Sequence, residues 1–304
     1  MVKRHGATLS LLVLFAWLAC LPAQEPQAAQ KQTPALPPGV KALRDLPYVP
    51  DGHVRQKLDL YLPEKAEGSL PVVVWVHGGA WRQGSKDRCP VVSFVPKGYA
   101  AASINYRLSQ HAKFPAQIED CREAIRWLRA HAKEYHLDND RFGVWGASAG
   151  GHLVALLGAS GTVTEWGAKG AHADQSCKVQ AVCDWFGPSD FYRLGGKNPN
   201  GDNALAQLIG GPVAENKEKA DKASPVTYVA KDAPPFLIMH GDKDALVPLS
   251  QSEVLTDALK KAGVDVSLIV LSGAGHGGPA FQSEDTRKQV VEFFDKHLKG
   301  SVKK

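Results

Sequence analysis

Runs of apolar residues alternate with amphipathic stretches from residue 54 onward. The run 71–77 (PVVVWVH) is apolar throughout, which is typical of a strand covered on both faces. The stretch 116–135 instead repeats its apolar residues at helical spacing. By these criteria we predict strands at 54–62, 71–77, 99–106, 142–146, 179–186, 235–240 and 266–271, and helices at 116–135, 150–157, 250–262 and 284–298. Such alternation predicts an α/β fold, with a mostly parallel central sheet and helices on both faces.

The first 23 residues have the organisation of a secretory signal peptide. Lys3 and Arg4 precede an apolar run at 7–21, and Ala23 provides a small residue where cleavage is expected. The run falls short of the about 20 apolar residues that cross a bilayer comfortably, although an uncleaved anchor helix is an alternative. We therefore expect residues 1–23 to be removed, no stable membrane span, and a secreted or periplasmic protein.

Two further segments break the alternation of strands and helices. Residues 24–45 are rich in Gln, Ala and Pro and lack periodicity, which predicts a disordered linker. The α/β domain then covers 46–304. Within it, 189–233 carries glycine pairs and a charged run. Either a small lid-like insertion, with a helix at 204–209, or a long surface loop fits this segment.

The composition is that of an ordinary globular protein, with 304 residues of which 44% are hydrophobic and 22% charged. The net charge is +5, and it falls to +3 when Lys3 and Arg4 leave with the signal peptide (5 − 2). Because this charge is small and scattered, we expect no nucleic-acid partner. The sequence also lacks the Cys/His spacing of a zinc site.

Four cysteines follow the signal peptide: Cys89, Cys121, Cys177 and Cys183. Export permits disulfides. A strand at 179–186 would nevertheless hold the Cα atoms of Cys177 and Cys183 about 20 Å apart, which is beyond the reach of a disulfide. We expect Cys183 to be a buried free thiol, and the sequence assigns no pairing.

Gly146-Ala147-Ser148-Ala149-Gly150 matches the pattern G-x-S-x-G between a predicted strand and a predicted helix, which is the context the pattern requires. Small neighbours leave room for a sharp turn that lifts the serine into the open. The helix N-terminus directs free N–H groups toward negative charge that develops there. We predict that Ser148 is a nucleophile.

His77-Gly78-Gly79 follows the buried strand at 71–77. Two glycines allow backbone N–H groups to point into a cavity and to stabilise an oxyanion, at about 3 kcal/mol per donor. We assign the oxyanion hole to the N–H groups of Gly78 and Gly79, together with that of Ala149. A tight turn without a role is the alternative. His77 is expected to brace this loop rather than to act as a base.

A carboxylate and a histidine follow two later strands. His240-Gly241-Asp242-Lys243-Asp244 offers two acids, of which we prefer Asp244 because Asp242 resembles a turn former. His276 lies in a glycine-rich loop after the last strand, where it can reach the serine with one ring nitrogen and the acid with the other. The order Ser148, Asp244, His276 is that of α/β-hydrolases.

These motifs give the segment 57–298 a clear resemblance to the α/β-hydrolase carboxylesterases, near the hormone-sensitive-lipase-like group and the secreted feruloyl and acetyl esterases. The matching pieces are His77-Gly78-Gly79, 146–151, 185–188, 240–244 and Gly275-His276. The chain departs from the lipase-like pattern at Ala80, where that group has a third glycine. The pattern HGG-x-W also occurs in kynurenine formamidases.

The resemblance implies an α/β-hydrolase fold and two-step ester hydrolysis through an acyl-enzyme, without a metal or another cofactor. Export suggests an ester outside the cytoplasm, either a small molecule or an acetyl or feruloyl group on plant polysaccharide. We expect Trp81 and Trp185 to offer flat substrate-binding surfaces. The alternatives are an amide hydrolase of formamidase or peptidase type, and a non-catalytic binding protein on a hydrolase scaffold.

Overall fold

The computed structural model describes residues 1–2, 35–66, 68–167, 170–195 and 199–300. Residues Pro34–Lys304 form one compact unit. The predicted signal peptide, apart from its first two residues, and the predicted linker up to residue 34 lie outside the described residues. Among those that are described, no helix has the length and the apolar character needed to cross a bilayer.

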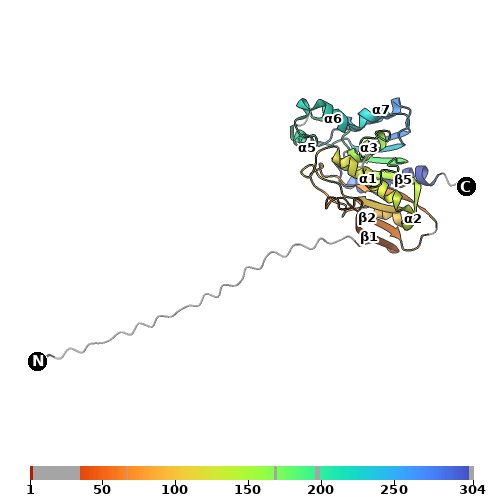
Figure 1. Ribbon diagram of the computed structural model, residues 1–304. Coiled ribbons are helices and arrows are strands. Elements are labelled where there is room, and N and C mark those ends of the chain that lie inside the picture. Colours follow the sequence, from red (N-terminus) through yellow and green to blue (C-terminus); the bar gives the residue numbers. More distant parts are fainter. Residues whose placement is uncertain (3–34, 67, 168–169, 196–198, 301–304) are drawn as a thin grey trace. The chain divides into compact units, whose positions relative to one another are not determined.

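An eight-stranded sheet, in the order β1-β2-β4-β3-β5-β6-β7-β8, forms the centre of this unit (Figure 1). β2 pairs antiparallel with β1 and with β4, and every other neighbouring pair is parallel. The prediction of a mostly parallel α/β sheet is therefore confirmed. The strands are β1 (Val40–Pro47), β2 (Lys57–Pro63), β3 (Leu70–Val76), β4 (Ala100–Ile104), β5 (Leu137–Ala147), β6 (Ala181–Trp185), β7 (Phe236–Gly241) and β8 (Val266–Leu271).

Helices cover both faces of the sheet, which explains the uninterrupted apolar runs of the central strands. All seven residues of β3 are buried. One hydrophobic cluster joins the sheet to the helices that carry Ile118, Leu153 and Leu255, and a second joins it to those that carry Phe94 and Phe294. The first set is α1 (Ala116–Ala130), α3 (Ala149–Ala159) and α7 (Ser250–Lys261); the second is η1 (Pro90–Lys97), α8 (Pro279–Gln282), α9 (Glu284–Phe294) and the π-helical turn η4 (Asp295–Lys299).

The described residues of the segment 189–233 form a group of short helices that includes 204–209, so the alternative of a long surface loop is wrong. Leu205, Leu208 and Ala220 from this group are buried in the first cluster, so the segment packs as part of the domain. Figure 1 shows α5 and α6 at the end of the domain far from β1 and β2. The helices are α4 (Phe191–Gly195), α5 (Pro199–Ile209), η2 (Val213–Glu215), α6 (Lys217–Ala223) and η3 (Pro225–Tyr228).

Two element predictions were wrong. The linker predicted at 24–45 extends too far, because β1 begins at Val40 and pairs with β2. β1 lies at the edge of the sheet and only Val40 in it is fully buried, so its sequence carries no alternation. The helix predicted at 116–135 is broken at His131, which separates α1 from α2 (Ala132–Tyr135).

The four cysteines of the described residues are free, and Cys183 is fully buried in β6. The prediction of a buried free thiol at this position is confirmed. Its position within a strand, with the side chain inside the second hydrophobic cluster, explains why it has no partner.

Candidate active site

Every residue predicted from the chemical motifs lies just after the carboxyl end of a parallel strand. The Gly78-Gly79 loop follows β3, Ser148 follows β5, Asp244 follows β7 and His276 follows β8. Because parallel strands end at one edge of the sheet, residues that are far apart along the chain meet there. This edge is the candidate active site.

Ser148 occupies a strained turn between β5 and α3. Its backbone has φ 57° and ψ −120°, a conformation that residues other than glycine rarely adopt. Its N–H donates to the Trp185 carbonyl at 2.8 Å. A Cβ atom added to Gly146 or Gly150 would collide with the backbone of Gly150 or of Val76. The glycines of the motif are therefore required by the close approach of β5, α3 and the end of β3.

His276 lies between Ser148 and Asp244. Its Nε2 is 2.8 Å from the Ser148 Oγ, and its Nδ1 is 2.7 Å from the Asp244 Oδ2. The Asp244 side chain has no exposed surface, whereas 18% of the His276 side chain is exposed. Because an ionised carboxylate can only accept a hydrogen bond, the His276 Nδ1 carries a proton and its N–H donates a hydrogen bond to Asp244. Nε2 is then the acceptor for the Ser148 hydroxyl.

Backbone and side-chain donors hold Asp244 in place. The N–H groups of Leu246 and Val247 both donate to Oδ1 at 2.9 Å, and the His240 Nε2 lies 3.3 Å from Oδ2. Burial alone would raise the pKa of Asp244, but the hydrogen bonds from both histidines and the backbone hold that pKa well below its ordinary value. The carboxylate therefore remains ionised at neutral pH.

Sequence reasoning missed His240 and Phe186. The His240 Nδ1 lies 2.6 Å from the Ser252 Oγ, while its Nε2 donates to the Val247 carbonyl at 2.8 Å, so the ring is fixed beside Asp244. The Phe186 ring packs against His276 with 4.6 Å between the ring centroids. Both residues lie in segments that carry the family resemblance, 185–188 and 240–244, but the sequence assigned neither of them a role in the site.

The loop after β3 lies directly against the serine turn. A Cβ added to Gly78 would be 3.3 Å from the Ser148 Cβ and 2.7 Å from the Ala147 carbonyl oxygen. Within the described residues, no acceptor is found for the N–H groups of Gly78, Gly79 or Ala149. Three backbone N–H groups, in the loop after β3 and at the start of α3, are thus left without an acceptor among the described residues.

Two further histidines, His77 and His152, are both buried. The His77 Nδ1 lies 2.7 Å from the Gly78 carbonyl oxygen. His152 accepts from the Trp81 Nε1 at 3.1 Å and donates to the Ala223 carbonyl at 2.7 Å. Burial lowers the pKa of each ring to about 4, so both are neutral at neutral pH.

The prediction of a substrate surface on Trp81 is wrong. Its side chain packs against His152 and Phe191, and the residue is only 3% exposed. Trp185 is only 8% exposed and packs against Trp145 and Phe281. It belongs to the second hydrophobic cluster, whereas Trp81 belongs to the first. Trp185 lines a cavity of about 1200 Å³ whose described lining contains no member of the Ser148–His276–Asp244 group. Buried indoles and accessible ones have the same sequence signature.

Known proteins resemble this chain in both sequence and fold. The family model BD-FAE matches residues 58–259. Esterase LipQ of Mycobacterium tuberculosis is 34% identical over 241 residues, which is 76% of this chain and 56% of the relative. The chain spans about half the length of the first curated relatives that it matches.

Solved structures share both the fold and part of the sequence. A structure described as a truncated form of a carbohydrate esterase from gut microbiota superposes with a TM-score of 0.79 at 31% identity, covering 84% of this chain and 95% of its own. An acetyl ester-xyloside bifunctional hydrolase from Caldicellulosiruptor lactoaceticus gives 0.63 at 26% identity, covering 79% and 84%. The chain therefore has the α/β-hydrolase fold.

Proposed function

Because the chain belongs to the BD-FAE family, we propose that it is a serine carboxylesterase that is exported and cleaves carboxylic esters through an acyl-enzyme. The observation that carries the proposal is the continuous hydrogen-bonded series from the Ser148 Oγ through His276 to Asp244. The same three residue types, in the same mutual order of contact, activate a serine for attack on a carbonyl.

In the first step, the Ser148 oxygen attacks the ester carbonyl while the His276 Nε2 takes the hydroxyl proton. Asp244 keeps the ring in the required tautomer and stabilises the imidazolium that forms. The carbonyl oxygen becomes negatively charged and accepts hydrogen bonds from the N–H groups of Gly78, Gly79 and Ala149. The bond to the alcohol then breaks, and His276 gives its proton to the leaving oxygen.

The second step repeats this chemistry with water. His276 takes a proton from a water molecule, whose oxygen attacks the acyl carbon. The bond to the Ser148 oxygen breaks, the proton returns to that oxygen, and the carboxylic acid leaves. The two side chains that exchange protons in this cycle, Ser148 and His276, lie 2.8 Å apart, and Asp244 lies 2.7 Å from the His276 ring.

For the substrate, we propose acetyl or feruloyl esters on plant polysaccharide. The similarity to a carbohydrate esterase and to an acetyl ester-xyloside hydrolase supports this class. The expected signal peptide supports a substrate outside the cytoplasm. The partial exposure of the His276 side chain is compatible with an ester on a large carrier.

Release of acid from defined esters tests the proposal. We expect the purified full chain to release acetate from acetylated xylan or ferulate from methyl ferulate and feruloylated xylan, and to hydrolyse p-nitrophenyl acetate. The matched control is Ser148→Ala, which should be inactive on all of them. Activity confined to p-nitrophenyl acetate would contradict the polysaccharide substrate. Faster turnover of N-formylkynurenine than of any ester would favour an amide hydrolase, and equal inertness of both proteins would favour a binding protein.

A further inference from the structure

The first three carbonyl groups of the loop after β3 each accept a hydrogen bond, whereas the N–H groups of Gly78 and Gly79 find no acceptor among the described residues. The Tyr106 hydroxyl donates to the His77 carbonyl at 3.0 Å, and the His77 Nδ1 donates to the Gly78 carbonyl at 2.7 Å. The Gly79 carbonyl accepts from the N–H groups of two later loop residues at 3.0 and 3.1 Å. Each carbonyl is thereby held in one direction.

Holding a carbonyl also aims the N–H of the same peptide. In a trans peptide the C=O and N–H bonds lie in one plane and point in opposite directions. The bond from Tyr106 to the His77 carbonyl therefore aims the Gly78 N–H, and the bond from His77 to the Gly78 carbonyl aims the Gly79 N–H. The loop needs such support because Gly79, Ala80 and Trp81 all have positive φ, at 114°, 53° and 57°.

The bond that aims the Gly79 N–H exists in only one tautomer of His77. A carbonyl oxygen accepts only, so Nδ1 must carry the proton. The His77 Nε2 lies 3.1 Å from the Arg55 Nη2. A guanidinium donates only, so Nε2 must be the acceptor and Nδ1 must be the protonated nitrogen. Arg55 thus selects the tautomer that the Gly78 carbonyl requires.

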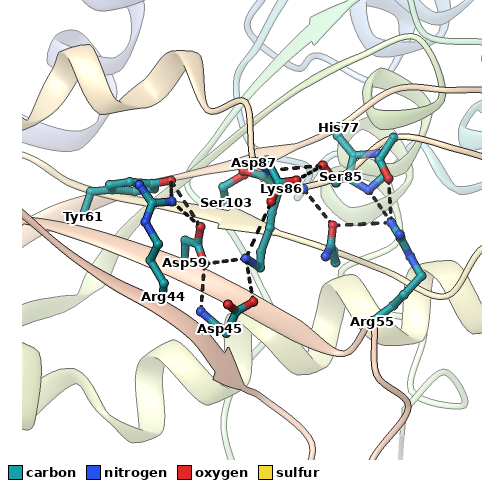
Figure 2. A network of polar contacts seen from close by, with 12 residues as sticks. Arg44, Asp45, Arg55, Asp59, Tyr61, His77, Ser85, Lys86, Asp87 and Ser103 are labelled. Carbon is teal, nitrogen blue, oxygen red and sulfur yellow. Dashed lines mark hydrogen bonds and ion pairs between the residues drawn. The ribbon is translucent and has the colours of Figure 1, made fainter. Parts of the chain in front are cut away.

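Arg55 is itself fixed in this position. Its Nε donates to the Tyr106 carbonyl at 2.8 Å, and its Nη2 donates to the Gly84 carbonyl at 2.9 Å. The His77 ring is 4% exposed and stacks on the Tyr106 ring, with 4.4 Å between centroids and 15° between planes. Figure 2 shows Arg55 pointing toward His77, with Arg44 at the opposite end of the same polar network.

We propose that Arg55 is a positioning residue for the reaction: by donating to the His77 Nε2 it fixes the tautomer whose Nδ1 orients the Gly78–Gly79 peptide and presents the Gly79 N–H to the oxyanion. The proposal rests on the function proposed above. Arg55 touches no reacting atom, and it acts through His77 and one peptide plane.

A double-mutant cycle separates this role from a merely structural one. Arg55→Met removes the group that donates to the His77 Nε2. His77→Asn replaces the ring by an amide whose nitrogen lies near the position of Nδ1. This nitrogen always carries protons, because an amide has no second tautomer. We expect Arg55→Met to lower kcat on p-nitrophenyl acetate about tenfold or more, because losing one oxyanion donor costs about 10²–10³. KM should change by less than about threefold. In the His77→Asn background, the same substitution should change kcat by less than about twofold.

Two controls keep the test independent of folding. Arg44→Met removes an arginine that is hydrogen-bonded to Asp59 and Tyr61 in the same network, so it reports the cost of losing a charge there, and its kcat should equal that of the wild type. Arg55→Gln is the second variant, because its amide can donate or accept and so permits both tautomers. If Arg55→Met fails to fold, Arg55→Gln takes its place in the test, and we expect it to lower kcat as well.

The tautomer is also read directly, by the 15N chemical shifts of histidine-labelled protein. We expect a protonated Nδ1 at His77 in the wild type and a mixture of tautomers in the folded Arg55 variants. A folded Arg55→Met or Arg55→Gln variant with wild-type kcat, an equal loss of kcat in the His77→Asn background, or an unchanged tautomer would overturn the proposal. If the wild type hydrolyses no ester but the tautomer changes as expected, the proposed function fails and the coupling of Arg55 to His77 stands.

Discussion

The Nε2 of His276 lies 2.8 Å from the Oγ of Ser148, although 128 positions separate the two residues along the chain. Neither residue acquires this contact from its own neighbours in sequence. β5 and β8 end at the same edge of the sheet, and the strained turn at Ser148 raises the hydroxyl toward the His276 loop. The sheet therefore assembles the pair on which the proposed chemistry depends.

Ser148→Ala removes the proposed nucleophile without removing packing. We expect kcat on p-nitrophenyl acetate to fall at least about 10⁴-fold, because His276 then has no hydroxyl to deprotonate. The melting temperature should stay the same or rise, because the Ser148 Oγ donates only one hydrogen bond among the described residues, the one to His276. Steady-state kinetics and a thermal melt check both statements.

Asp244→Asn tests the buried acid by its charge alone. An amide of the same shape can donate to His276 and so favours the wrong tautomer, and we expect kcat to fall about 10³–10⁴-fold. The pKa of Asp244 is depressed in the folded protein, so its charge stabilises the fold above the ordinary carboxyl pKa, and this contribution disappears as the pH falls through the folded pKa. Urea unfolding should therefore show a deficit for the variant that is larger at pH 7 than at pH 3.

Gly84→Ala should perturb the loop after β3 by contact. A Cβ at this position would be 2.6 Å from the His77 Nδ1 and would also collide with the Gly78 carbonyl oxygen. We expect kcat to fall about tenfold or more. Gly98→Ala is the matched control, because its φ of +83° resembles the +95° of Gly84 while its Cβ would meet nothing within 4 Å.

In both variants the alanine is forced into a positive φ, which should lower the free energy of unfolding by a similar amount, about 1–2 kcal/mol. Only the Gly84 variant should lose activity, as measured by kcat at saturating p-nitrophenyl acetate. Equal kcat values for the two variants would show that the loop does not need its present geometry.

Acid should destabilise the protein through two buried histidines. Burial lowers the pKa of His77 and of His152 from 6.5 to about 4, so the unfolded chain binds more protons than the folded protein between these values. Above pH 6.5 both rings are neutral in the folded and in the unfolded chain, and the free energy of unfolding is at its full value. As the pH falls toward and below 4, that free energy drops by about 3 kcal/mol for each ring. In urea unfolding from pH 7 to pH 4, His152→Gln should show a shallower loss than the wild type.

The sequence allowed the strand-end motifs to be predicted because each combines a local signal with a general rule. Ser148, Asp244 and His276 stand in or beside glycine-rich turns that directly follow apolar runs, and parallel strands bring such turns together. By contrast, β1 could not be predicted, because an edge strand with one buried residue has no periodicity of its own.

The supporting residues escaped prediction for a different reason. Arg55 and Tyr106 act on His77 from 22 and 29 positions away, and nothing in the local sequence pairs them. The direction of Trp81 was equally hidden, because its indole pairs with a histidine 71 positions later and turns into the core. Long-range hydrogen bonds and burial depend on the packed fold, which periodicity alone does not specify.

Covalent labelling with a phosphonate ester tests the central claim most directly. The reagent forms a stable tetrahedral adduct with an activated serine that has an oxyanion hole beside it. Peptide mapping by mass spectrometry should find one phosphonyl group on Ser148 in the wild type and none in Ser148→Ala, with loss of esterase activity in proportion to labelling. Esterase activity that survives complete labelling of Ser148, or a label on another residue that abolishes it, would contradict the account.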